Sequence, residues 1–320
     1  MMKHAIRLSR LVKDSMSETL LYWNMQHYEW SKTMEAFQIS QKGYYYSMND
    51  REVARVYAAV ADEYNQSPLA TQEGWTYSPS FQGFLHMRAI ANYLSPNGLL
   101  VDIGTGCGIG ARFGLKLGAR VISIDSSDAS GLSALQNVKL AGAEVYSCDL
   151  LRDQLPVESE TADCVLFSDV IEHLLHSPKP GLLEIKRILK PGGVCVASTP
   201  NSTRLSVRLK LMFGFSNWPD IHDFFHAPGH FGHHHEYSIT EFRYVFEESG
   251  FTVKSFELYE HNLRATRIHS LDQLGNHDRK TENRRPESLK YRLAKVPFIA
   301  LTQLAPSLRS NMLLIASKPV

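Results

Sequence analysis

The chain has 320 residues, of which 43% are hydrophobic, with 34 basic and 33 acidic side chains. This length can bury a sizeable core as one large α/β domain with insertions or as two small domains. The near-neutral charge produces no long-range attraction to nucleic acid or to an anionic membrane, so either partner would need a local charged patch.

The cysteine pattern and the amino-terminal stretch indicate the cellular setting. The four cysteines are far apart and form no C-x-x-C pair, so we expect reduced thiols in the core. No apolar run is long enough for a signal-peptide core, and no segment approaches the length of a membrane span. These features predict a soluble, cytoplasmic protein without stable membrane insertion.

Residues 1–75 differ in composition from the rest of the chain. They carry many aromatic side chains and include the stretch REVARVYAAVADEY, whose apolar residues have helical spacing. We therefore predict a helical cap over residues 1–75 and a catalytic domain over residues 76–320.

From residue 99 onward, short apolar runs alternate with helical segments. Such alternation is typical of a mainly parallel sheet with helices on both faces, a Rossmann-like α/β fold. Two further runs are predicted to close the sheet and make it seven-stranded. The expected strands lie at residues 99–104, 119–125, 143–149, 163–169, 193–199, 251–260 and 311–319.

Two insertions interrupt this alternation, at residues 201–237 and 261–307. The first follows the fifth strand directly, and ligands of open α/β sheets bind beyond the carboxyl ends of the strands. We therefore expect residues 201–237 to form a lid over a bound substrate. The sequence assigns no role to residues 261–307.

The first strand runs into a glycine-rich turn, VDIGTGCGIGA. Glycine permits tight turns and close approach of a ligand to main-chain N–H groups. Gly106, Gly108 and Ala111 also fit the G-x-G-x-x-A dinucleotide pattern, so a nicotinamide oxidoreductase is an alternative. Asp102 at the strand tip favours a ligand with an ammonium group over a pyrophosphate, because the carboxylate would repel a phosphate.

Later strands also end in polar residues. Asp125 ends the second strand, where a carboxylate can bind both ribose hydroxyls of NAD or of S-adenosylmethionine. Asp149 ends the third strand, where the side chain or the adjoining backbone could bind adenine, and Ser168 with Asp169 ends the fourth.

Over about residues 53–319, the order of these pieces resembles the class I S-adenosylmethionine-dependent methyltransferases. The matching motifs are VDIGTGCG, VISIDSS, CDLLRDQLP, DCVLFSDVIEHL, EIKRILKPGGVCVASTPN and HHHEYSITEFRYVFEESGF. The resemblance implies S-adenosylmethionine as donor and S-adenosylhomocysteine as product. It implies a donor pocket that comprises Asp102, Gly104, Thr105, Gly106, Asp125, Ser126, Asp149, Leu150 and Ser168, with Tyr57 and Tyr64 as candidates at the methionine end or as core residues.

A hydroxyl or protonated amine acceptor also needs a base within hydrogen-bond reach. Glu172 and His173 follow the fourth strand and should lie near the sulfonium. The lid is the second source of bases, because six of the fourteen histidines fall within fourteen residues of it. They are His222, His226, His230, His233, His234 and His235, of which His233 and His235 are the catalytic candidates.

The sequence D-x-x-E-H also suggests a divalent metal site. Similar motifs occur in ubiquinone-pathway O-methyltransferases and in small-RNA 2′-O-methyltransferases, with which magnesium or a related ion is associated. The resemblance makes Asp169, Glu172, His173 and His233 candidate ligands of Mg²⁺, which could orient an acceptor hydroxyl and lower its pKa. In the alternative interpretation, Glu172 pairs locally and His173 packs.

Aromatic side chains concentrate in the two segments predicted to flank the acceptor, which favours a small organic or lipid-like acceptor methylated at oxygen. No basic tract with interleaved aromatics supports nucleic acid as a partner. A homodimer is a candidate assembly, and a non-catalytic donor-binding scaffold remains an alternative. The aromatic residues are Trp23, Trp30, Tyr44, Tyr45, Trp75 and Tyr77 in the first segment, and Phe213, Phe215, Trp218, Phe224 and Phe225 in the lid.

Overall fold

The computed structural model describes most of the predicted catalytic domain. The described residues are 48–67, 70, 77, 79–217, 225–226, 232–260, 297–298, 300–302 and 304–320. Most of the predicted cap, part of the lid and nearly all of the second insertion lie outside them. The cap and the role of the second insertion therefore stay predictions.

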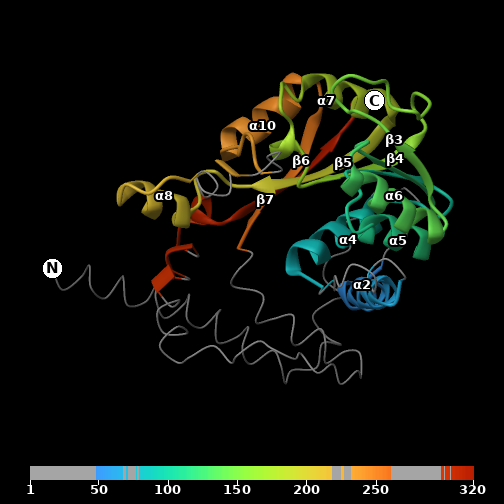
Figure 1. Ribbon diagram of the computed structural model, residues 1–320, viewed down its shortest axis with the longest axis horizontal. Helices are drawn as coiled ribbons and strands as arrows, with labels where there is room; N and C mark the ends of the chain where they lie inside the picture. Colours follow the sequence, from blue (N-terminus) through green and yellow to red (C-terminus); the bar gives the residue numbers. More distant parts are fainter. Residues whose placement is uncertain are drawn as a thin grey trace. The chain divides into compact units, whose positions relative to one another are not determined.

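A seven-stranded sheet forms the centre of the fold (Figure 1), as the sequence predicts. Its strand order is β3-β2-β1-β4-β5-β7-β6, with β1 to β5 parallel and β7 antiparallel to both of its neighbours. All seven predicted runs form strands. They are β1 (Leu99–Ile103), β2 (Arg120–Asp125), β3 (Glu144–Ser147), β4 (Ala162–Ser168), β5 (Leu189–Pro200), β6 (Thr252–Tyr259) and β7 (Asn311–Ser317).

Helices cover both faces of this sheet. Alternate residues of one strand enter different cores, so that Leu100 joins the cluster shared with α4 and α5 while Val101 joins the cluster shared with α7 and α10. The two clusters explain why the central strands are apolar on both faces. The helices on the two faces are α4 (Phe81–Tyr93), α5 (Ile109–Lys116), α6 (Ala129–Leu140), α7 (Lys179–Ile188) and α10 (Ile239–Glu248).

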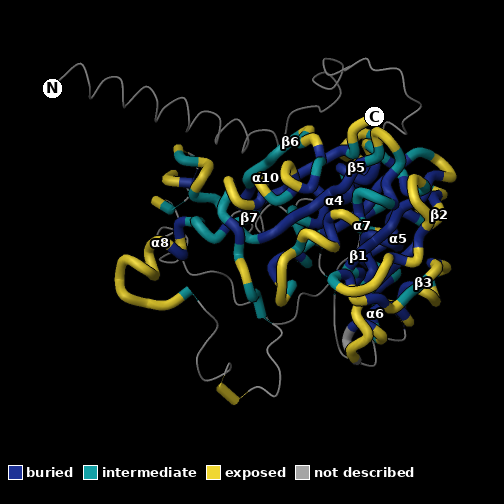
Figure 2. Tube along the Cα trace, turned by 90° about the horizontal axis from the view of Figure 1, so that it is seen from above, coloured by how far each residue is buried: buried dark blue, intermediate teal, exposed yellow. Residues whose placement is uncertain are grey.

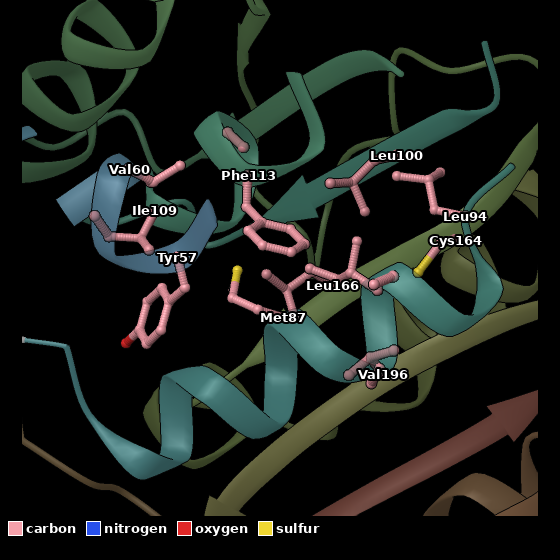
Figure 3. Packing of buried hydrophobic residues seen from close by; sticks show 14 of the residues in the cluster. Tyr57, Val60, Met87, Leu94, Leu100, Ile109, Phe113, Cys164, Leu166 and Val196 are labelled. Atoms are coloured by element: carbon pink, nitrogen blue, oxygen red, sulfur yellow. The ribbon is translucent and has the colours of Figure 1, made fainter. Parts of the chain in front are cut away.

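Helix α2 (Asp50–Asn65) is the predicted helix REVARVYAAVADEY. It begins at a capping box in which Asn49 and Glu52 bond each other's backbone N–H groups, each at 3.0 Å. Its apolar face packs on α4 and α5, and Figure 3 shows Tyr57 and Val60 beside Phe113. Although it lies within the predicted cap, α2 therefore contributes to the core beside the sheet.

The remaining short elements lie around the carboxyl edge of the sheet. They are the 3-10 turns η1 (Ile171–His173) and η2 (Pro306–Leu308), and helix α8 (Leu205–Met212) in the predicted lid. No helix among the described residues has both the length and the apolar composition needed to cross a bilayer. As expected, the cysteines form no disulfide, and three of the four are buried.

Candidate functional site

The glycine-rich turn after β1 is held by the carboxylate of Asp102. Its Oδ2 accepts hydrogen bonds from Thr105 Oγ1 at 2.9 Å and from the backbone N–H of Ala111 at 3.1 Å. The side chain is buried, and this burial raises the pKa of Asp102 to about 7 although both donors oppose the shift. Asp102 therefore ties the turn to the first turn of α5.

Gly104 makes the contact between this turn and the segment after β4. Its φ of +71° lies in the left-handed region, and an added Cβ would lie 2.3 Å from Cγ2 of Val170. Only glycine fits this close approach without displacing Val170. The glycine turn and residues 169–173 are consequently in direct contact.

Asp125 lies beside the same turn, at the end of β2. One carboxylate oxygen accepts the Gly106 N–H at 3.1 Å, and the other accepts the Ser126 N–H at 2.8 Å. The side chain is only half-buried. Its oxygens, each with two lone pairs, retain capacity to accept hydrogen bonds from a ligand on the exposed side.

The loop after β3 continues this edge. Asp149 is exposed, accepts the Leu151 N–H at 2.9 Å and lies 3.5 Å from Arg152. Leu150 is buried, and an added Cβ on Gly181 would lie 2.7 Å from its Cγ. Asp149 thus orders the loop, while Leu150 anchors it on α7.

A polar network lies at the end of β4. Ser168 Oγ is 3.2 Å from Nδ1 of the buried His86 and 3.0 Å from Ser198 Oγ. Ser198 also donates to Asp169 Oδ1 at 3.0 Å, and Gln82 donates to the other oxygen of Asp169. Both oxygens of Asp169 are therefore engaged within the protein.

Glu172, on η1, is a buried carboxylate with one free oxygen. Its Oε2 accepts a hydrogen bond from Thr199 at 3.0 Å, whereas Oε1 has no partner among the described residues. Burial, with a further contribution from the charge of Asp169, raises the pKa of Glu172 to about 7. A carboxyl with this pKa can accept and release protons near neutral pH.

Two histidines meet this carboxyl. The rings of His173 and His233 pack edge to face with centroids 4.9 Å apart, and one ligand atom from each lies within 4.8 Å of a Glu172 oxygen. The backbone N–H of His234 donates to the Glu172 carbonyl at 2.7 Å, which fixes this part of the lid beside η1. The structure thus brings together three of the predicted site residues.

The two histidines differ in their protonation. Loss of surrounding water and the neighbouring His233 lower the pKa of His173. A 2.8 Å hydrogen bond to Glu236 raises the pKa of His233. The ring of His173 is therefore neutral over more of the pH range and can act as a hydrogen-bond or proton acceptor there, whereas His233 holds its proton more firmly.

Next to this group lies an open pocket of about 210 Å³, to which polar residues contribute both polar and carbon atoms. Glu236 organises it by pairing with Arg204 at 2.6 Å and accepting from Asn217 at 3.1 Å. Burial opposes ionisation, but the donors His233, Arg204 and Asn217 lower the pKa of Glu236 to about 2. The lining residues are Ser202, Asn217, His233, His234, His235 and Glu236.

Comparison with known proteins identifies the domain that contains the sheet. Residues 101–197, from β1 to β5, match a family model described as a methyltransferase domain. The chain contains a class I S-adenosylmethionine-dependent methyltransferase domain.

The chain is also similar to curated proteins, among them two methyltransferases. The ribosomal protein L11 methyltransferase of Listeria welshimeri is 33% identical over 119 residues, which is 36% of each chain. The ubiquinone biosynthesis O-methyltransferase of Roseobacter denitrificans is 33% identical over 102 residues, which is 32% of this chain and 41% of the relative. The chain thus spans well under half the length of the curated relatives it matches.

Solved structures include two similar chains. One comes from a complex of the Haloferax volcanii Trm112 methyltransferase activator with a methyltransferase, at 18% identity, a TM-score of 0.49 and coverage of 83% of this chain and 98% of that one. The other is a SAM-dependent methyltransferase from Archaeoglobus fulgidus, at 18% identity, a TM-score of 0.47 and coverage of 74% and 94%.

The predicted tyrosines lie in the core of the methyltransferase domain. Tyr57 is 1% exposed; its hydroxyl is 2.6 Å from that of Tyr77 and accepts the Ser80 N–H at 3.0 Å. In Figure 3 this hydroxyl points away from the neighbouring apolar side chains. Tyr64 is also buried and packs edge to face on Tyr77. This placement corresponds to the core alternative considered for both residues.

Several residues near the predicted site lacked a sequence signal of their own. His86 and Gln82 come from α4, far from β4 in the chain, and nothing local marks them. Thr199, in contrast, lies at the carboxyl end of the fifth strand in the motif ASTPN, and Glu236 directly follows the histidine run. A search of all strand ends and of the whole lid for polar residues would have found these two.

The predicted aromatic lining is only partly described, and its described members lie elsewhere. Phe213, Phe215 and Phe225 are largely exposed and do not line the pocket, while Tyr77 packs in the core. His235 lines the pocket, packs on Tyr237 and is exposed. The other aromatic residues of that prediction, together with His222 and His230, lie outside the described residues.

Proposed function

We propose that this protein transfers a methyl group from S-adenosylmethionine to a hydroxyl oxygen of a small or lipid-like acceptor. The observation that carries the proposal is the meeting of Glu172, His173 and His233 at the segment that contacts the glycine turn through Val170. The proposed donor-binding turn and a cluster of three titratable side chains thus lie side by side.

The reaction is an in-line displacement. The acceptor oxygen attacks the methyl carbon, the bond between this carbon and sulfur breaks, and S-adenosylhomocysteine leaves with the electron pair. The acceptor proton passes to a base within hydrogen-bond reach. The protein must hold the three reacting atoms nearly collinear and exclude water, which a covering lid would favour.

Glu172 is the proposed base, with His173 as the second candidate. Its free oxygen and its pKa of about 7 allow it to accept a proton at neutral pH. His233, whose pKa is raised by Glu236, is better suited to donate a hydrogen bond to the acceptor. In this arrangement His235, at the pocket wall, contacts the acceptor without taking its proton.

The matched relatives do not agree on an acceptor, because one is named for ribosomal protein L11 and the other for ubiquinone biosynthesis, so the pocket is the guide to the acceptor. The lining of the 210 Å³ pocket offers hydroxyl, amide, imidazole and carboxylate groups. Such a lining favours a molecule that presents hydroxyl groups at the reacting end.

Calorimetric titration with S-adenosylhomocysteine tests the donor part of the proposal, with NAD as the control ligand. We expect micromolar binding of S-adenosylhomocysteine and none of NAD. Binding of NAD alone would favour a nicotinamide oxidoreductase, and binding without methyl transfer to any hydroxylated acceptor would favour the non-catalytic scaffold.

A metal-assisted version of the reaction is the second candidate, favoured by the three ligand atoms of Glu172, His173 and His233 within 4.8 Å of one another. The unpartnered Glu172 Oε1 fits a ligand role. Asp169 fits less well, because Gln82 and Ser198 already engage both of its oxygens. A divalent ion held there would orient the acceptor hydroxyl and lower its pKa.

Metal removal separates the two versions. If an ion assists, treatment with a chelator should lower turnover by at least about 100-fold, because acidification of the acceptor is lost, and added Mg²⁺ or Mn²⁺ should restore it. His233→Ala should raise the ion concentration required. Full turnover in the chelated enzyme would exclude the metal-assisted version.

A further inference from the structure

Helix α8 ends in an exposed apolar group, here named the α8 tip: Leu211, Met212, Phe213 and Phe215. These side chains are 58%, 68%, 68% and 66% exposed, whereas Leu205 and Val207 at the start of the helix are buried. An added Cβ at Gly214, between the two phenylalanines, would meet nothing within 4 Å. Figure 2 accordingly shows most of α8 and the turn after it as exposed, so the tip protrudes from the domain.

The described segment around the α8 tip is basic, and Asp220 and Asp223 follow it outside the described residues. Residues 201–217 contain Arg204, Arg208 and Lys210 and no acidic residue. Arg204 pairs with Glu236 in the pocket, but Arg208 and Lys210 are exposed and form no ion pair among the described residues. Two exposed basic side chains, of which Arg208 donates its Nε to the Thr203 carbonyl at 2.6 Å, therefore precede the four exposed apolar side chains.

This combination matches the surface of an anionic bilayer. Aromatic and aliphatic side chains enter the boundary between headgroups and acyl chains, while nearby lysine and arginine are attracted by anionic headgroups. We propose that the α8 tip docks this protein on an anionic lipid bilayer. Because the tip is the exposed end of a short surface helix, docking through it would be peripheral.

The α8 tip belongs to a segment that begins and ends at the pocket. The segment starts at Ser202 and ends at Asn217, both of which line the pocket, and Asn217 donates to Glu236 there. Docking would thus bring the pocket close to the lipid headgroups. This last step rests on the proposed function and assigns the acceptor to the membrane-embedded class; the docking itself does not depend on it.

Vesicle flotation of the full chain tests the docking without donor or acceptor. We expect flotation with vesicles of equal parts phosphatidylglycerol and phosphatidylcholine and little with phosphatidylcholine alone. The double variant Phe213→Ser with Phe215→Ser should lower the vesicle-bound fraction by at least about tenfold, because both exposed rings are lost. Arg208→Gln with Lys210→Gln should lower it by about tenfold on the anionic vesicles only.

The matched control is Lys139→Gln with Leu140→Ser, which removes an exposed basic and an exposed apolar residue from the end of α6. It should float like the wild type, and all variants should keep the wild-type unfolding temperature because the replaced side chains are exposed. Absence of wild-type flotation, equal loss in the control, or a change of oligomeric state in the phenylalanine variant without loss of vesicle binding would overturn the docking. Docking without methyl transfer would overturn the proposed function only.

Discussion

Asp125→Ala is expected to weaken S-adenosylhomocysteine binding by about 100-fold or more. A carboxylate that accepts two ribose hydroxyls forms two charge-assisted hydrogen bonds, each contributing about 1.5–3 kcal/mol, and tenfold in affinity corresponds to about 1.4 kcal/mol. The oxygens of Asp125 already bond Gly106 and Ser126 from the protein side, which holds them in place for the ligand. Calorimetric titration of wild type and variant measures the loss.

Two further variants show whether the loss is specific. Glu158→Ala removes an exposed acidic side chain and should leave the donor affinity unchanged. Asp149→Ala should have a smaller effect than Asp125→Ala, because the proposed adenine contact can also come from the adjoining backbone. The free energy of unfolding of Asp125→Ala should be near that of the wild type, since its partners lie near solvent. An unchanged affinity in Asp125→Ala would remove this residue from the ribose role.

The sheet and the positions of the residues proposed to bind the donor could be predicted because their signals are local. Each strand is a short apolar run, and in a parallel sheet all the carboxyl ends meet at one edge. The residues that follow β1, β2, β3 and β4 are therefore neighbours whatever the details of packing. Contacts such as Gly106 with Asp125, 19 positions apart, follow from that rule alone.

The acceptor side depends on contacts between distant segments. Gln82 reaches Asp169 across 87 positions, and Ser168 meets His86 across 82 positions. The resemblance grouped Glu172, His173 and His233 as candidate ligands of one ion, but the residue pattern alone does not place His233 beside Glu172, because their encounter depends on how the lid lies on η1. Hydrogen bonds such as that from His234 to the Glu172 carbonyl decide this, and periodicity does not encode them.

Aromatic composition did not predict which surface the aromatic side chains contact. Phe213 and Phe215 belong to the predicted lid, but they are exposed, whereas Tyr77 packs against Tyr57 and Tyr64. A cluster of aromatic residues in the sequence shows that large apolar side chains are present. It does not show whether they pack in the core, line a pocket or remain exposed. The polar groups of the pocket come instead from histidines, an amide and a carboxylate.

Glu172→Gln should lower kcat by about 100-fold to 10,000-fold, the range for loss of a general base. Glutamine has nearly the same shape and can still accept the hydrogen bond from Thr199, but it cannot take a proton. Glu172 must be ionised to act, and its pKa is raised to about 7, chiefly by burial. Wild-type kcat/KM should therefore fall about tenfold per pH unit below pH 7, and this dependence should disappear in the variant.

The pH profile is what separates catalysis from structure at this position. If Glu172 only supported the fold, Glu172→Gln would change kcat without removing the acidic limb of the profile. Glu257→Gln, which removes a charge paired with Arg88 at the surface, should leave both kcat and the limb unchanged. Near wild-type turnover in Glu172→Gln, together with loss of the limb in His173→Asn, would instead assign the base to His173, whose lowered pKa keeps its ring neutral.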